Sequence, residues 1–191
     1  MGRPMKRIVW LAGALALVAI GAGVFIWSGV YDVAADDPHW AVTQSLLKIA
    51  LDRSVESRTS GITVPNLGSD SLIRAGAGNY DAMCAQCHLE PGEDDSELSK
   101  GLYPAPPDLS RRGIDNSAEA FWIIKHGIKM TGMAAWGKSM GDDDIWGMVA
   151  FLQRLPKMSE NEYHELVEAS GGHSHSGHES GHDEHEHEHK D

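Results

Sequence analysis

The two cysteines of this chain lie three residues apart and are followed directly by a histidine, in the run Cys84-Ala85-Gln86-Cys87-His88. C-x-x-C-H is the attachment pattern of c-type haem. Cysteines at this spacing lie about one helical turn apart, so both thiols can add to the two vinyl groups of one porphyrin. The histidine that follows can then ligate the iron. The motif therefore predicts a domain that folds around one covalently bound haem.

Two other interpretations of a C-x-x-C pair find less support. A structural zinc site needs four nitrogen or sulfur ligands, and the second pair would have to come from distant histidines. A thioredoxin-like redox pair needs a strand and βαβ surroundings. No stretch of this sequence alternates convincingly between apolar and polar residues as a half-buried strand does. Haem attachment is the favoured interpretation.

A run without charged residues occupies positions 8–31, and three basic residues precede it. Twenty such residues in a helix rise about 30 Å, which is enough to cross the core of a bilayer. The basic flank is expected to stay in the cytoplasm, so that the rest of the chain lies on the other side. Residues 1–35 are therefore predicted to be a membrane anchor. The alternative is a cleavable signal peptide, since Val33-Ala34-Ala35 offers small residues to a peptidase.

The apolar run is longer than the roughly 7–15 apolar residues of a signal peptide, which favours the retained anchor. Either interpretation exports the remaining chain, in agreement with thioether formation outside the bacterial cytoplasm. We expect a bacterial inner-membrane protein with a cytoplasmic N-terminus and its haem domain in the periplasm.

The segment 36–69 predicts a connecting helix followed by a linker. Asp37 is the expected N-terminal cap, with Pro38 at the first helical position. An apolar stripe at i, i+4 and i+8 follows, and predicts a structural helix that packs on the haem domain. The stripe consists of Leu47, Leu51 and Val55.

Residues 70–158 are predicted to form the haem domain, with three helices around the motif. Gly76 and Tyr80 of the first helix are expected to cross the last helix at Val149 and Phe151, because a helical glycine costs roughly 1 kcal/mol and tends to occur where another backbone comes close. The three helices are expected from Asp70 or Ser71 to Cys84, from Ser117 as cap to His126, and from a cap among Asp142 to Asp144 to Leu155.

Four methionines follow the motif and are candidates for the sixth iron ligand. Met148 belongs to the apolar face of the last helix and is expected in the core, and Met140 is expected to close a loop. Met130 and Met133 lie in an irregular segment between helices, where a thioether can cover the far face of the porphyrin. The residues leave open which of the two ligates. Five-coordinate iron and bis-histidine ligation also remain open.

These features together resemble those of class I c-type cytochromes, which are monohaem electron-transfer domains. In that family a helix with glycine and an aromatic residue leads into C-x-x-C-H, and a methionine loop of T-G-M-P-A-W type precedes the last helix. The chain departs from the pattern at Ala134, where many members have proline. The matching residues are Gly76, Tyr80, Cys84, Cys87, His88, Thr131, Gly132, Met133, Trp136 and Phe151.

The resemblance implies an all-α, cytochrome c-like fold with one haem c per chain, bound to Cys84 and Cys87. It implies His88 and Met133 as the axial ligands, with Met130 as the alternative. Class I members also use a proline carbonyl to accept a hydrogen bond from the proximal histidine, which fixes the ring and raises its basicity. The candidates are Pro104, Pro106 and Pro107, of which Pro106 and Pro107 are preferred, and the candidate contacts of the haem propionates are Arg111, Arg112 and Trp136.

Histidine and methionine ligation closes the iron to substrate, so the implied function is one-electron transfer rather than enzymatic catalysis. The chain is expected to serve periplasmic or membrane redox proteins, free-standing or as the cytochrome subunit of a larger oxidoreductase, and no nucleic-acid partner is expected. A ligand sensor or peroxidase-like enzyme with a labile Met133 is an alternative. Three lysines around the methionine loop form either a docking rim or an ordinary solvated surface, namely Lys125, Lys129 and Lys138.

Residues 159–191 carry one lysine against ten acidic residues, a net charge of −9, so most of the chain's net charge of −12 lies in this tail. A short polar helix is expected at its start, through Tyr163, and disorder beyond it. The tail is either solubilising or a site for Zn, Cu or Ni, which would make the chain a metal-handling haem protein. Its candidate ligands are His173, His175, His178, His182, His185, His187 and His189.

Overall fold

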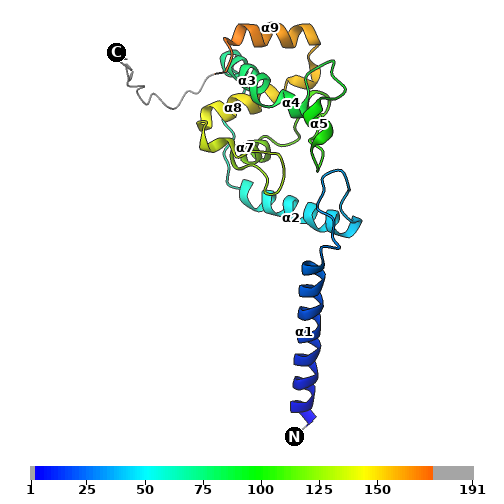
Figure 1. Ribbon diagram of the computed structural model, residues 1–191. Helices are drawn as coiled ribbons and strands as arrows, with labels where there is room; N and C mark the ends of the chain where they lie inside the picture. The colour runs from blue at the N-terminus through cyan, green and yellow to red at the C-terminus, as the bar shows by residue number, and fades with distance from the viewer. Residues whose placement is uncertain (1–2, 174–191) are drawn as a thin grey trace, which may run out of the picture. The chain divides into compact units, whose positions relative to one another are not determined.

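The computed structural model describes residues 3–173, which form helices and contain no strand, as the sequence predicts (Figure 1). The chain divides into two compact units, Met1–Pro38 and His39–Asp191. The α-helices are α1 (Arg3–Ser28), α2 (Ala41–Thr59), α3 (Asp70–Met83), α4 (Ala85–His88), α5 (Glu97–Gly101), α6 (Leu109–Arg112), α7 (Ser117–His126), α8 (Asp142–Leu152) and α9 (Glu160–Ser170), and the 3-10 helices are η1 (Trp136–Lys138) and η2 (Leu155–Lys157).

The first unit consists of one helix, α1, and the turn that follows it. Its segment Pro4–Ser28 is long and apolar enough to cross a membrane, a property that it shares with signal sequences. The Ser28 hydroxyl donates to the Phe25 carbonyl oxygen at 2.7 Å, and Gly29 follows with a φ of 66°. The apolar helix thus ends in a glycine turn, as helices commonly do.

In the second unit, α3 crosses α8 with the two backbones in contact at a pair of glycines. A Cβ atom on Gly76 would lie 2.0 Å from the carbonyl oxygen of Gly147. The predicted crossing is therefore confirmed, but Gly76 meets Gly147 instead of Val149 or Phe151. Tyr80 does reach Phe151, with ring centroids 5.3 Å apart. Gly147 was not singled out because the sequence alone does not show which residue of a partner helix faces a glycine.

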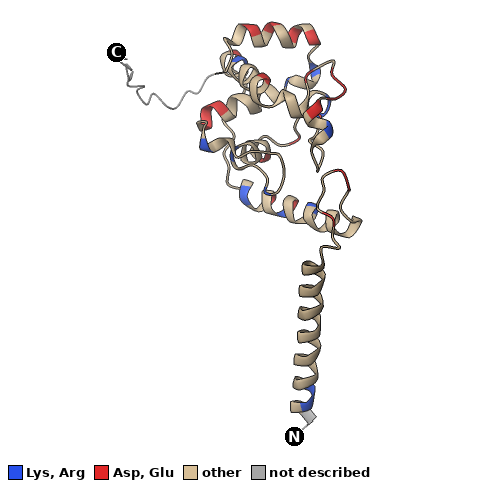
Figure 2. Cartoon of the chain, viewed as in Figure 1, with Lys and Arg blue, Asp and Glu red and all other residues tan. Residues whose placement is uncertain are grey.

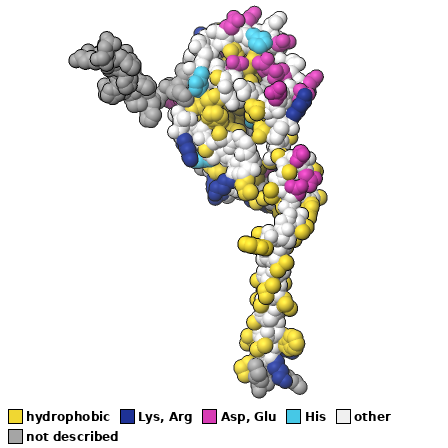
Figure 3. All heavy atoms as spheres, viewed as in Figure 1, with side chains coloured by type: hydrophobic (Ala, Val, Ile, Leu, Met, Phe, Trp, Pro, Cys, Tyr) yellow, Lys and Arg dark blue, Asp and Glu magenta, His cyan; other side chains and the backbone are white. Residues whose placement is uncertain are grey.

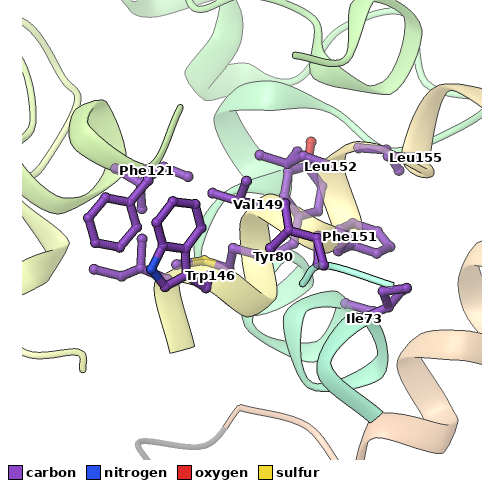
Figure 4. Close-up of a cluster of buried hydrophobic side chains, with 14 of the residues drawn as sticks. Ile73, Tyr80, Phe121, Trp146, Val149, Phe151, Leu152 and Leu155 are labelled. Atoms are coloured by element: carbon purple, nitrogen blue, oxygen red, sulfur yellow. The ribbon is translucent and has the colours of Figure 1, made fainter. Parts of the chain in front are cut away.

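The core is built on both sides of α8, as Figure 4 shows. On one side Phe121 of α7 stacks on Trp146, with centroids 4.1 Å apart and rings inclined by 12°. On the other side Tyr80 and Phe151 are fully buried. Met148 lies in this core as expected, and Met140, predicted to close a loop, is also buried there.

Helix starts differ from the sequence predictions by one to three residues. Asn116 caps α7 in place of Ser117, since its side-chain oxygen accepts from the backbone N–H groups of the first turn. At α8 the Asp144 carboxylate accepts from the Gly141 N–H at 3.2 Å. The helix α2 starts at Ala41 rather than at Pro38, and the backbone N–H of His39, just before it, donates to the Tyr103 hydroxyl at 3.0 Å.

The sequence predicts that the haem domain ends at residue 158. In the structure, the folded domain continues beyond this residue. Residues Glu160–Ser170 form the helix α9, whose first turn is capped by Ser159. Tyr163 is completely buried and donates a hydrogen bond from its hydroxyl to the Asp81 carboxylate of α3 at 2.9 Å. The predicted polar helix through Tyr163 is therefore present, and what the acidic composition concealed is its attachment to the domain through the buried Tyr163. The chain beyond residue 173 lies outside the described residues.

Replacing Gly76 by alanine should force α3 and α8 apart, because the new methyl group would overlap backbone that cannot move away by rotating a side chain. We expect Gly76→Ala to lower the free energy of unfolding by about 1–3 kcal/mol or more. Denaturant unfolding of the haem-loaded chain measures it. Gly61→Ala is the matched control, since no atom lies within 4 Å of its added Cβ. Equal stabilities of the two variants would contradict the close crossing.

Truncating Tyr163 tests whether α9 belongs to the folded domain. Tyr163→Ala should cost about 3–5 kcal/mol, as expected for removal of a buried aromatic side chain. Glu165→Ala on the exposed face of α9 should stay within about 0.5 kcal/mol of the parent chain. Thermal unfolding followed by circular dichroism measures both variants, and a silent Tyr163→Ala would show that α9 is not part of the cooperative unit.

Candidate haem site

The C-x-x-C-H motif forms one helical turn directly after α3. The backbone N–H of Cys84 still donates to the Tyr80 carbonyl at 2.8 Å, and the N–H of His88 donates to the Cys84 carbonyl at 2.8 Å. Both thiols are free, and the two cysteines and His88 are half-buried. This turn presents two sulfur atoms and an imidazole together, which is the arrangement that attachment of one porphyrin needs.

The electrostatics of the cysteine pair argue against a redox dithiol. Burial, with a smaller contribution from Cys87, raises the pKa of the Cys84 thiol to about 12. Redox-active C-x-x-C pairs have the opposite property, a lowered pKa that supplies thiolate near neutral pH. Cys84 is therefore a protonated thiol in this structure.

Tyr80 holds the end of the motif in place. Its buried hydroxyl lies 2.7 Å from the Leu89 carbonyl oxygen and 3.2 Å from that of His88. Burial raises the pKa of Tyr80 well above its usual value, so the hydroxyl stays a donor. Leu89 is buried with a φ of 68°, a conformation that favours glycine. Nothing in the sequence indicates this role of Leu89, since a leucine gives no signal of a positive φ.

The imidazole of His88 is oriented by a proline carbonyl. Its Nδ1 lies 2.9 Å from the carbonyl oxygen of Pro107, so this contact falls to Pro107 among the candidate prolines. A carbonyl can only accept, hence Nδ1 carries the proton and the lone pair is on Nε2. Burial lowers the pKa of His88, against the opposing effect of the Pro107 bond. The ring is therefore neutral at pH 7, which is the form that ligates a metal.

The structure distinguishes the two candidate methionines. Met130 is 100% exposed and has a φ of 58°, at the tip of its loop. Met133 is partly buried and packs against the core. Its backbone is fixed from both sides, because its N–H donates to the Thr131 hydroxyl oxygen at 3.1 Å and its carbonyl accepts from the Ile128 N–H at 3.2 Å.

Two glycines let this methionine loop approach its neighbours. Gly127 ends α7 with a φ of 64°, and a Cβ atom there would lie 2.6 Å from the Met133 carbonyl oxygen. A Cβ on Gly132 would lie 2.6 Å from Leu102, which begins the stretch that leads to Pro107. The loop that carries Met133 and the stretch that orients His88 are thus packed against each other.

The arginines expected near the haem propionates are engaged by carboxylates. Arg111 pairs with Asp94 and with Asp108, the latter at 3.5 Å. Arg112 pairs with Asp115 at 3.6 Å. Propionate contacts of these arginines therefore stay a prediction, as does that of Trp136, which lies partly buried against the core.

Among the other predicted residues, Lys125 is also engaged. Its ammonium group lies 2.6 Å from an Asp142 carboxylate oxygen and 5.4 Å from the centre of the Phe121 ring. Lys129 and Lys138 are exposed.

The Nδ1 atom of His173, a predicted metal ligand of the tail, lies 3.1 Å from the side-chain oxygen of the buried Asn79. The remaining histidines of the predicted metal site lie outside the described residues, so that site stays a prediction.

Comparison with protein families supplies independent evidence. Residues 71–152 match the family model described as cytochrome C oxidase, cbb3-type, subunit III. The matched segment runs from the start of α3 to the end of α8, so it contains the C-x-x-C-H turn, the oriented imidazole and the methionine loop. This segment is a class I c-type cytochrome domain. Comparisons with the curated proteins and with the solved structures found no match.

A cytochrome domain of this class binds haem c covalently and transfers electrons. The residues present fit that group, because both thiols are free and the donor nitrogen of His88 is Nε2, opposite the bonded Nδ1. The match ends at residue 152, so η2 and α9 lie outside it although they complete the folded domain.

The methionine loop should depend on Gly127. In Gly127→Ala the side chain would meet backbone at 2.6 Å and force a positive φ on alanine, a conformation that costs roughly 1–2 kcal/mol for a non-glycine residue. We expect the ferric absorption spectrum of the haem-loaded variant to lose its thioether-to-iron charge-transfer band. Gly101→Ala, where the added Cβ has open space, should keep it. Identical spectra would show that Gly127 does not hold the ligand loop.

Proposed function

We propose that this protein is a single-electron carrier in which His88 and Met133 ligate the iron of one haem c attached to Cys84 and Cys87. The observation that carries the proposal is the contrast between the two methionines. Met133 is packed on the core and fixed by backbone hydrogen bonds, whereas Met130 points fully into solvent. A held thioether closes the sixth position, which favours electron transfer over binding of a substrate or a sensed ligand.

When bound, haem supplies the one-electron chemistry, and the side chains set its potential and hold it still. The Pro107 carbonyl keeps the proton of His88 on Nδ1 and raises the basicity of Nε2. A thioether as second ligand raises the reduction potential. Tyr80, by bonding to the Leu89 carbonyl, fixes the turn that carries both thioether links. Little of the site has to move when an electron arrives.

We further propose that α1 anchors the domain in a bacterial inner membrane with the haem in the periplasm. Support comes from the length and composition of Pro4–Ser28 and from the need of haem c for export. The partners would be periplasmic or membrane redox proteins. The matched family description names a subunit of an oxidase, which supports a role as the cytochrome subunit of a membrane oxidoreductase.

The charge pattern of the domain supports guided docking. Acidic side chains gather along α9 and around α5, as Figures 2 and 3 show. Lys129 and Lys138 are exposed on either side of the Met133 loop. An acidic partner surface would therefore be attracted to the methionine side of the domain and repelled from the α9 side.

The ligand assignment is tested by comparing two methionine variants of the haem-loaded chain. Met133→Ala should lose the charge-transfer band in the ferric state and bind carbon monoxide in the ferrous state, because the iron gains an open position. Met130→Ala is the matched control, since Met130 is fully exposed, and should leave both spectra unchanged. The reverse pattern would make Met130 the ligand. Carbon monoxide binding by the parent chain would favour the sensor or peroxidase-like function.

A further inference from the structure

The helix α2 carries apolar side chains that the domain does not cover. Val42, Leu46, Leu47 and Ile49 are each 54–63% exposed, and we call them the α2 apolar face. All four lie in the first half of the helix, where Lys48 is the one charged residue between positions 41 and 50. The exposed large hydrophobic residue Trp40 directly precedes the helix. Contiguous exposed apolar surface on a folded domain marks an interaction site.

The way α2 packs explains why this surface is uncovered. The stripe formed by Leu47, Leu51 and Val55 changes from 54% exposed at Leu47 to half-buried at Leu51 and 4% exposed at Val55. The predicted packing of α2 on the domain thus holds for its second half, where Val55 and Thr59 are buried. The first half projects beyond the surface to which the second half is attached.

A second stripe of α2 changes from apolar to polar residues at the same place along the helix. Val42, Leu46 and Ile49 lie at i, i+4 and i+7, and the same helical face continues through Arg53 and Ser57. One line along the helix is therefore apolar over its first turns and polar afterwards. A structural role inside this domain does not account for that change, because both halves of this stripe are exposed.

The tether to α1 restricts what can cover the α2 apolar face. The helix α1 ends at Ser28 and α2 begins at Ala41. The 12 residues between them span at most about 43 Å when fully extended, at up to 3.6 Å per residue. If α1 crosses a membrane, as we propose above, the first half of α2 stays within this distance of the bilayer. A lipid surface is therefore always within its reach.

We propose that the α2 apolar face inserts into the interface of the same membrane that α1 crosses. Helices with an apolar face can lie in a membrane interface in this way, with the apolar side buried about 5–10 Å into the boundary between headgroups and acyl chains. The attachment rests on apolar contact, since Lys48 is paired with Asp52 at 2.7 Å and three acidic residues lie between α1 and α2. This second attachment fixes the orientation of the haem domain above the bilayer.

The orientation has a consequence for the acidic helix. In the second unit, α2 and α9 lie at opposite ends of the domain, as Figure 1 shows. With α2 at the lipid surface, α9 faces away from the membrane. Donors and acceptors embedded in the membrane would then meet the less acidic side of the domain.

The test uses the haem-loaded full chain in phosphatidylcholine bilayers, with one introduced thiol labelled by an environment-sensitive fluorophore. Both native cysteines are then thioether-linked, so the new thiol is the one that reacts. The two sites are Leu46→Cys on the α2 apolar face and Ser57→Cys, which lies on the same side of the helix three turns later and is also exposed. Spin-labelled lipids serve as the quencher.

We expect the label at position 46 to lose more than about half of its emission, because the apolar face lies within the depth range of the quencher, and the label at position 57 to lose much less. The quenching should persist in 1 M salt, where charge attraction is screened. It should disappear when Leu46→Cys is combined with Val42→Asp and Ile49→Asp. The haem spectrum of each variant checks its folding.

Absent or equal quenching at the two positions, in a chain that stays in the bilayer, would overturn the proposal. So would disulfide-linked dimers of Leu46→Cys without quenching, which would make a second copy the occupant of the face. Extraction by alkaline carbonate tests the anchor separately. A chain that is extracted but was quenched at position 46 beforehand would refute the α1 anchor and support the α2 contact.

Discussion

The contact between the backbones of Gly76 and Gly147 is the interaction on which the rest of the domain depends. It brings α3 so close to α8 that Tyr80 reaches Phe151, and both rings are completely buried. Tyr80 in turn fixes the carbonyl of Leu89 and with it the end of the C-x-x-C-H turn. The position of the two thiols relative to the core is therefore set about two helical turns before Cys84, at Gly76, which meets Gly147 with no side chain on either residue.

The sequence predicted what depends on local pattern. The cysteine spacing, the apolar helix, and the helical segments of the domain follow from periodicity and motif, and they agree with the structure and with the matched family. What depends on contacts between distant residues was not predictable. Gly147 has no special sequence context, and α9 looks like the start of an acidic tail until Tyr163 is seen buried against Asp81.

In the candidate site, too, local pattern predicts the kinds of residue involved, and contacts between distant residues decide which ones act. A proline carbonyl was expected to orient His88, but the choice of Pro107 depends on the folded path of the stretch that begins at Leu102, next to Gly132, and no local pattern encodes that path. Likewise Met130 and Met133 are equivalent by composition. They are distinguished by hydrogen bonds to Thr131 and Ile128 and by the close approach of Gly127, all of which require the folded loop.

The burial of Cys84 has a consequence for the order of events in maturation. With a pKa of about 12, this thiol holds its proton in the folded domain throughout the physiological range. Because the thiolate is the reactive form, we expect thioether formation to proceed more readily on a chain in which Cys84 is not yet buried. Attachment before Cys84 is buried would make the porphyrin part of the template on which the helices assemble.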